Sequence, residues 1–139
     1  MNIVIAPQAF KGSMTGMEAA CAIADGVIKA NPDAQTVLIP MADGGDGTLE
    51  VLVNAPSQGS FETKGRYFTT TVTGPMGEPV LATWGATGIH HMAVIEMAKA
   101  SGLAIIPQDQ RDPKKATTYG TGQLVQAALD FGYREIIVG

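Results

Sequence analysis

The chain of 139 residues has a single cysteine, Cys21, and only nine basic residues against thirteen acidic ones. One cysteine cannot form an internal disulfide, and no other Cys or His lies at metal-site spacing from it, which agrees with a reducing compartment. The net charge of −4 and the thin spread of lysine and arginine provide no basic stripe that would follow a nucleic-acid backbone. We therefore expect no nucleic-acid partner.

Long apolar runs are also missing. No run approaches the roughly 18 residues that a membrane span needs, and the chain enters a strand-like run at Ile3 without the n-region of a signal peptide. These features predict a cytoplasmic protein with no membrane partner. The length allows one substantial core, or one domain and part of another, and it excludes a large multidomain enzyme.

Two nucleotide-binding patterns are absent. The sequence contains no Gly-x-x-x-x-Gly-Lys-Ser/Thr, and no Gly-x-Gly-x-x-Gly follows the first strand-like run. These absences disfavour a P-loop protein and a Rossmann dinucleotide-binding protein.

The most informative segment that is present is Asp43-Gly44-Gly45-Asp46-Gly47-Thr48, between a strand-like run and a helix-like run. Glycine lets a backbone approach a ligand closely, and a helix start offers free N–H groups and a partial positive charge that suit phosphate. Asp43 and Asp46 add a Mg²⁺ ligand or a proton acceptor for an attacking hydroxyl. In parallel α/β sheets ligands bind where strands end, so this segment is a candidate ligand loop.

An ordinary structural interpretation of the same segment stays open. Asp-Gly and Gly-Gly are common tight-turn dipeptides, and Asp before a helix is a frequent N-cap. The composition of the loop does not separate a turn from a binding site.

The first 56 residues predict a β-α-β-α opening. Apolar runs at residues 3–6 and 37–39 are typical of buried parallel strands. Between them, Thr15 and Glu18 have the spacing of a capping box, and helical periodicity continues to about Asn31. Cys21 falls on the apolar side of this pattern, so we expect a buried, inert thiol. A short helix over residues 48–53, stopped by Pro56, completes the unit.

The composition changes near residue 57, where a polar break is followed by a strand-like segment rich in threonine and aromatic residues. We place a domain boundary there. Residues 67–73 and 80–86 predict two strands joined through the hairpin or corner at residues 74–79. Trp84 lies on the same strand face as alternating apolar residues, so we expect it to pack in a core rather than to stack on a base.

Three more places carry candidate site residues. Glu96 follows the apolar run at residues 93–95, so it either faces the same pocket as Asp43 or is a surface or capping residue of the next turn. Lys11 and Ser13 follow the first strand, where a lysine is either a point charge for an anion or an ordinary exposed residue. A second helix entrance is rich in hydroxyls and glycine and offers N–H and O–H donors to an anion, or else only helix caps: Thr118, Gly120, Thr121 and Gly122.

Five ordered blocks of the sequence match a known pattern together: residues 3–7 with 10–13, 40–48, 72–80, 93–98 with 100–103, and 117–122. On these blocks the chain resembles the N-terminal part of the bacterial glycerate kinase family, of the glyoxylate- and glucarate-pathway type. The resemblance extends from end to end of the chain.

This resemblance implies phosphorylation of D-glycerate with ATP and Mg²⁺, by in-line transfer of the γ-phosphoryl group. It also implies two α/β domains, the second inserted into the first, so we assign residues 1–56 to the first and 57–139 to the second. In this scheme Asp43 contacts the metal or the hydroxyl, Lys11 neutralises charge, and Ser13, Asp46, Glu96 and the glycine and threonine residues of both loops bind substrate or phosphate.

The chain departs from the family pattern in two positions and in length. The family usually has Asp-Ser where this chain has Gln8-Ala9, which puts a carboxylate role at position 8 in doubt, and Glu where it has Asp46. Family members are roughly 2.5 times longer, so we expect a fragment. Two alternatives follow: a module that holds glycerate or nucleotide without turnover, and a structural fragment with an incomplete site.

Overall fold

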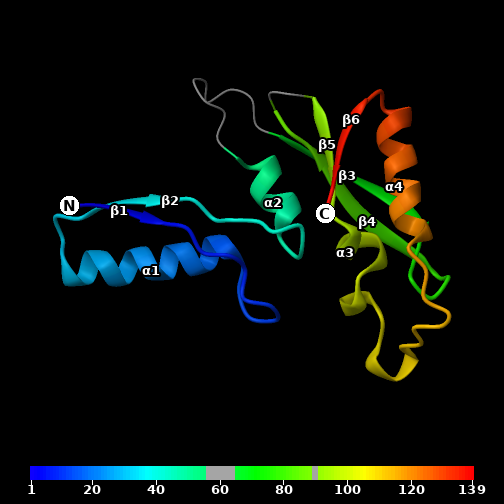
Figure 1. The fold of residues 1–139 in the computed structure, drawn as a ribbon, viewed down its shortest axis with the longest axis horizontal. Coiled ribbons are helices and arrows are strands. Elements are labelled where there is room, and N and C mark those ends of the chain that lie inside the picture. The colour runs from blue at the N-terminus through cyan, green and yellow to red at the C-terminus, as the bar shows by residue number, and fades with distance from the viewer. Residues whose placement is uncertain (56–64, 89–90) are drawn as a thin grey trace.

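The computed structural model describes residues 1–55, 65–88 and 91–139, which form two sheets with helices against them (Figure 1). Strands β1 and β2 make a parallel pair, and the other four strands form a mixed sheet in the order β3-β4-β5-β6. The elements in chain order are β1 (Asn2–Ile5), α1 (Gly16–Ala30), β2 (Gln35–Leu38), α2 (Thr48–Val53), β3 (Arg66–Thr73), β4 (Pro79–Ala86), β5 (Met92–Ile95), α3 (Met97–Ser101), the 3₁₀ turns η1 (Leu103–Ile105) and η2 (Gln108–Gln110), α4 (Tyr119–Asp130) and β6 (Glu135–Val138).

The predicted β-α-β-α opening is confirmed, but the prediction that its strands are buried holds for one face only. Strands β1 and β2 pair in parallel, with Asn2 opposite Gln35, and α1 connects them. Alternate residues of a strand point to opposite faces. One face of the pair therefore packs on α1 in a small cluster of Ile3, Ile5, Ala20, Ala24 and Leu38, whereas Val4 and Val37 on the other face are exposed.

The start of α1 is the capping box that the sequence predicts. The Thr15 hydroxyl accepts from the Glu18 amide (3.2 Å), and the Glu18 carboxylate accepts from the Thr15 amide (2.7 Å). The backbone hydrogen bond from Thr15, with a smaller contribution from its hydroxyl, holds the pKa of Glu18 below its usual value. The helix ends at Ala30 with Asn31 as its C-cap, close to the predicted end.

The expectation of a buried Cys21 is wrong, because its side chain is exposed. The buried stripe of α1 consists of small residues, among them Ala20 and Ala24. A pair of strands is too narrow to cover the whole apolar arc of the helix. Met17 and Ile28, four residues before and seven residues after Cys21 and so on the same side of the helix, are also exposed.

The four strands in the second half of the chain form the mixed sheet. The predicted hairpin forms: β3 and β4 pair antiparallel and are joined through a turn in which the Gly74 amide donates to the Glu78 carbonyl. Strand β5 pairs antiparallel with β4 and parallel with β6, which it reaches through α4. The carboxyl ends of β3, β5 and β6 therefore lie at one edge of the sheet.

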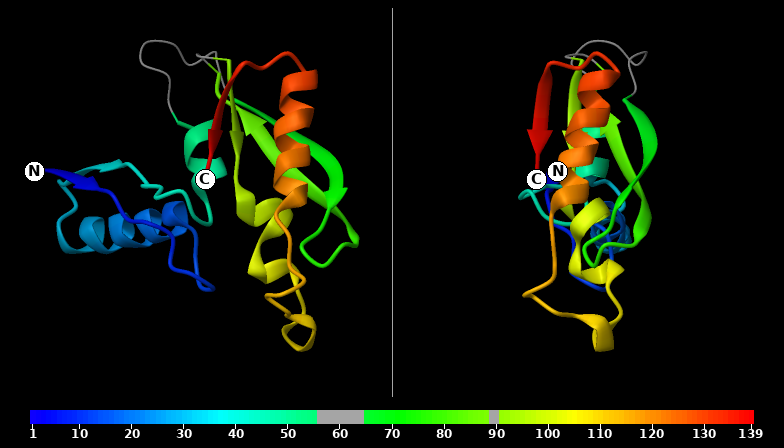
Figure 2. Two further views of the ribbon diagram at one scale, coloured as in Figure 1. Left: turned by 45° about the vertical axis from the view of Figure 1, so that its right-hand side comes forward. Right: turned by 90° about the vertical axis from the view of Figure 1, so that its right-hand side faces the viewer.

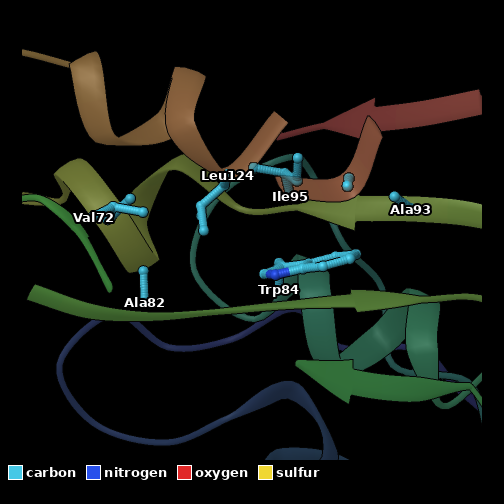
Figure 3. Packing of buried hydrophobic residues seen from close by; sticks show 8 residues of the cluster. Val72, Ala82, Trp84, Ala93, Ile95 and Leu124 are labelled. Atoms are coloured by element: carbon cyan, nitrogen blue, oxygen red, sulfur yellow. The ribbon is translucent and has the colours of Figure 1, made fainter. Parts of the chain in front are cut away.

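Alternation along β5 decides which helix covers which face. Ala93 and Ile95 point toward α4 and join a core cluster with Trp84 and Leu124 (Figure 3). Val94 points to the other face and packs on Leu49 and Val53 of α2. The mixed sheet thus lies between α2 on one face and α3 with α4 on the other.

Trp84 is a packing residue, as predicted. Its indole is fully buried and stacks on the Phe68 ring with the centroids 4.4 Å apart. The indole Nε1–H donates to the Thr70 hydroxyl (3.0 Å), so its one polar atom is satisfied.

Helix α2 stands between the two sheets in Figure 1 and in the left view of Figure 2. The predicted helix stop at Pro56 and the predicted boundary near residue 57 lie outside the described residues, and the division into two domains stays a prediction. Among the described residues, no helix is both long enough and apolar enough to cross a membrane.

Leu124 provides a test of this core. Its side chain is fully buried between α4 and the mixed sheet, so we expect Leu124→Ala to lower the free energy of unfolding by about 2–5 kcal/mol. Urea denaturation followed by Trp84 fluorescence measures the change. Leu103→Ala is the matched control, because Leu103 is 59% exposed, and it should change stability by less than about 0.5 kcal/mol. Equal effects of the two substitutions would contradict this packing.

Candidate functional site

Residues 43–48, which we call the Asp43 loop, connect β2 to α2 in a folded turn. The Asp43 Oδ1 atom accepts from the Gly45 amide (3.0 Å), and the Thr48 Oγ1 atom accepts from the Gly44 amide (3.1 Å). Gly44 and Gly47 both have φ of +93°, in the left-handed region that favours glycine. The loop conformation therefore requires glycine at these two positions.

The Asp43 loop lies where three strands end. Gly44 packs on Gly139, the residue after β6; a Cβ on Gly139 would stand 2.8 Å from the Gly44 carbonyl oxygen. A Cβ on Gly47 would stand 3.9 Å from Ala9, after β1. Glu96, after β5, accepts from the Leu49 amide at the start of α2 (2.9 Å). Strand exits from both sheets thus meet at this loop, the position where α/β proteins bind ligands.

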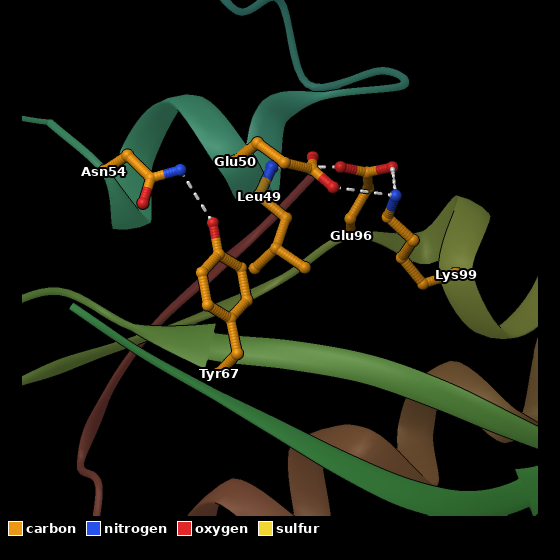
Figure 4. Close-up of polar contacts among 6 residues, drawn as sticks. All are labelled: Leu49, Glu50, Asn54, Tyr67, Glu96 and Lys99. Carbon is orange, nitrogen blue, oxygen red and sulfur yellow. Dashed lines mark hydrogen bonds and ion pairs between the residues drawn. The ribbon is translucent and has the colours of Figure 1, made fainter.

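Glu96 is the most buried charged residue of this region, with 1% of its surface exposed. Its Oε2 atom accepts a hydrogen bond from the Leu49 amide, and its Oε1 atom lies 3.7 Å from Lys99 Nζ (Figure 4). Lys99 Nζ in turn lies 3.1 Å from the carboxylate of Glu50 on α2. Burial acts to lower the pKa of Lys99, but the hydrogen bond to Glu50 and the charges of Glu96, Glu50 and Asp46 outweigh it, so this pKa is raised. Lys99 is therefore a cation at neutral pH.

Three backbone donors of the Asp43 loop have no acceptor among the described residues. The amides of Gly44 and Gly45 have side-chain acceptors, and that of Thr48 donates to the Gly45 carbonyl. Within residues 1–55, 65–88 and 91–139, the amides of Asp43, Asp46 and Gly47 have no hydrogen-bond acceptor. The side chains of Asp43 and Asp46 are exposed beside them.

The second candidate loop lies at the same edge of the mixed sheet. Gly120 is buried against the backbone of Thr73 at the end of β3, and the Thr121 hydroxyl hydrogen-bonds Ser101 at the end of α3 (2.9 Å). Thr118 and Gly122 are exposed. Helix α3 begins directly after Glu96 and has five residues. The length of this helix, roughly 7 Å, therefore separates the second loop from Glu96.

Lys11 and Ser13 are exposed in the turn after β1, where Phe10 and Met14 bridge. In the described part of the chain, neither side chain has a recorded contact with the Asp43 loop. The roles predicted for both residues stay predictions.

A surface hollow of about 370 Å³ lies away from these loops, at the opposite edge of the sheet. It is lined by His91, before β5, by residues 131–134 between α4 and β6, and by Glu135, the first residue of β6. The neighbouring His90 lies outside the described residues. The hollow contains none of the candidate site residues.

Sequence reasoning missed two parts of the site. Lys99 stands three residues after Glu96, a spacing that on a helix pairs opposite charges and that would have indicated the ion pair. The contact between Glu96 and Leu49 spans 47 residues and has no local signal.

Fold and site together define a mixed α/β protein with a glycine-rich loop at the carboxyl ends of its strands. Comparison with known proteins agrees: residues 3–139 match the model of the Glycerate kinase family. This chain belongs to that family.

Individual relatives support the assignment. The chain is 48% identical to a glycerate kinase of Bacillus subtilis and 46% identical to a glycerate 2-kinase of Escherichia coli K12, in each case over all 139 residues and 35% of the relative. The crystal structure of a glycerate kinase 2 from Salmonella typhimurium LT2 matches with a TM-score of 0.76 and 47% identity, over 100% of this chain and 36% of that one. The chain thus spans about a third of the length of these relatives.

Gly47 provides a test of the loop geometry. A Cβ on Gly47 would meet only ordinary contacts, so the left-handed φ is the obstacle, and Gly47→Ala should lower the free energy of unfolding by about 1–2 kcal/mol. Gly26→Ala is the matched control. Gly26 lies inside α1 with open space around it, so this substitution should raise stability by about 0.5–1 kcal/mol. Thermal unfolding of both variants measures these changes as shifts of the midpoint temperature. Shifts of the same sign in the two variants would contradict the described loop conformation.

Proposed function

We propose that the protein is a glycerate kinase, an enzyme that transfers the γ-phosphoryl group of ATP to a hydroxyl of D-glycerate. The observation that carries the proposal is the family match over residues 3–139 together with the Asp43 loop at the strand exits. In the reaction the glycerate oxygen forms a bond to the γ-phosphorus, the bond to the β-phosphate oxygen breaks, ADP leaves, and the hydroxyl proton passes to a base.

The Asp43 loop supplies the groups that such a transfer needs. Phosphoryl transfer depends chiefly on positioning and on neutralising charge. We assign the free amides of Asp46 and Gly47 to an anionic oxygen of a substrate, since the amides of Gly44 and Gly45 already hold the turn together. The exposed carboxylate of Asp43 contacts the reacting hydroxyl or a metal ion.

Mg²⁺ fits the chemistry of this loop. In phosphoryl-transfer sites it is bound through one or two carboxylates together with substrate phosphates and water, rather than in a cage of protein ligands. The described residues contain no group of three or more metal-ligating side chains, and the two exposed carboxylates of Asp43 and Asp46 are the donors that this loop offers. When bound, Mg²⁺ would neutralise phosphate charge.

The remaining candidates act around this centre. Lys11 and Ser13 extend from the neighbouring strand exit, and Thr48 closes the loop through its hydroxyl. The second loop offers donors for phosphate or glycerate from Thr118, Gly120, Thr121 and Gly122. Glu96 belongs to the same edge and meets the loop through the Leu49 amide. The proposal includes a cytoplasmic location, where ATP is supplied.

The test is ADP release by the protein expressed from its complete gene, with ATP and Mg²⁺, in the presence and absence of D-glycerate. We expect glycerate-dependent release. Asp43→Ala should lower kcat/KM at least about 100-fold, because it removes a group in contact with the metal or the reacting hydroxyl.

Asp109→Ala is the matched control for this assay. Asp109 is an exposed carboxylate in η2, outside both candidate loops, and its removal should leave the rate unchanged. ADP release that does not depend on glycerate would contradict the proposed activity. Full activity of the Asp43→Ala variant would contradict the assignment of that residue.

A further inference from the structure

The first turn of α2 has no hydrogen-bond acceptor from its own N-cap side chain. The N-cap residue is Gly47, which has no side chain to accept a hydrogen bond from the first turn. Ser, Thr, Asp or Asn at this position normally accepts from the second or third amide of a helix. At Gly47 the left-handed φ of +93° disfavours those residues. The loop conformation and a local side-chain cap are therefore difficult to combine.

A distant residue supplies the missing acceptor. Glu96 Oε2 accepts from the amide of Leu49, the second residue of α2, at 2.9 Å. Leu49 is fully buried, so water has poor access to this amide, and a buried amide without an acceptor is costly. Glu96 thus does for α2 what an N-cap side chain does in an ordinary helix, across 47 residues of sequence.

The charge of Glu96 is balanced within the protein. Its Oε1 atom has no hydrogen-bond partner among the described residues, but Lys99 Nζ lies 3.7 Å away. Lys99 also binds Glu50 on α2 at 3.1 Å. A buried carboxylate requires a counter-charge, and this one has it without a metal or substrate. The ion pairs also tie α3 to α2.

Glu96 could act instead as a direct ligand of substrate or metal. Three observations weigh against that role: the residue is 1% exposed, one oxygen is occupied by Leu49, and the other faces Lys99. A carboxylate in direct contact with a phosphate group would also repel it, because both groups are negatively charged. Asp43 and Asp46 are exposed on the same loop, and in the described part of the chain neither forms an ion pair, although Asp43 Oδ1 accepts from the Gly45 amide.

We infer that Glu96 is a positioning residue: it clamps the start of α2 to the exit of β5 and so holds the Asp43 loop, with the free amides of Asp46 and Gly47, in the arrangement that binds substrate. Glu96 itself does not touch substrate. The inference rests on the proposed function for its kinetic consequence, but the clamp itself is a statement about structure.

Two substitutions separate positioning from direct binding. Glu96→Gln keeps an oxygen that accepts from the Leu49 amide and removes the charge, whereas Glu96→Ala removes both. We expect Glu96→Gln to keep kcat/KM within about threefold of the unmodified protein. Glu96→Ala should lower it roughly 30-fold or more, as the loop loses its fixed position. Glu50→Gln is the control, because Glu50 shares Lys99 but does not touch the loop, and it should stay within about threefold.

A second readout does not depend on the reaction. Endoproteinase Asp-N cleaves before aspartate, so it reports on opening of the loop at Asp43 and Asp46. Cleavage there should be at least about fivefold faster in Glu96→Ala than in the unmodified protein and unchanged in Glu96→Gln. This measurement stands even if the protein has no glycerate-dependent activity, which separates failure of the clamp from failure of the proposed function.

Each result decides. Activity and loop protection that are kept in Glu96→Gln and lost in Glu96→Ala support the clamp. An equal loss of kcat/KM in both variants, with the loop still protected in Glu96→Gln, would show that the charge acts on substrate or metal and would overturn the inference. Unchanged behaviour of both variants would also overturn it. If Glu96→Ala does not fold, Glu96→Gln decides alone: kcat/KM within about threefold supports the clamp, and a loss beyond about 30-fold overturns it.

Discussion

The hydrogen bond from the Leu49 amide to the Glu96 carboxylate is the interaction on which the arrangement of the site depends. It joins the start of α2 to the exit of β5, and the helix carries the Asp43 loop with it. A second tie, from the Asn54 side chain to the Tyr67 hydroxyl (2.9 Å), fixes the other end of α2 to β3. The short helix is therefore held at both ends by side chains of distant elements, which a six-residue helix requires because it is marginal by itself.

The same placement gives the loop its neighbours. Because Val94 points toward α2 and the adjacent Ala93 and Ile95 point toward α4, β5 is covered on both faces and its exit lies directly below the loop. Strand β6 runs parallel to β5, so its end, at Gly139, comes to the same edge. Period-two alternation in one four-residue strand thus sets both the layers of the sheet and the surroundings of the candidate site.

Local patterns allowed much of this fold to be predicted from the sequence. The capping box at Thr15 and Glu18, the hairpin of β3 and β4 and the packing role of Trp84 each depend on residues close together in the chain or on one strand face. The prediction that Cys21 is buried was wrong. Burial of this side chain depends on the width of the sheet against which α1 packs, and helical periodicity carries no information about that width. Proximity of Glu96 to the Asp43 loop was one of two alternatives that the sequence left open, because both residues follow strands but Glu96 could also have been a surface or capping residue. The partner of Glu96 was not predicted, because a backbone amide 47 residues away leaves no mark in the sequence.

Amide hydrogen exchange in the unmodified protein, measured residue by residue by NMR, tests the central claim most directly. The account predicts a protected Leu49 amide, since it is buried and bonded to Glu96, next to rapidly exchanging amides of Asp46 and Gly47, which have no acceptor within the described residues. A Leu49 amide that exchanges as fast as those of Asp46 and Gly47 would contradict the clamp and, with it, the described position of the loop.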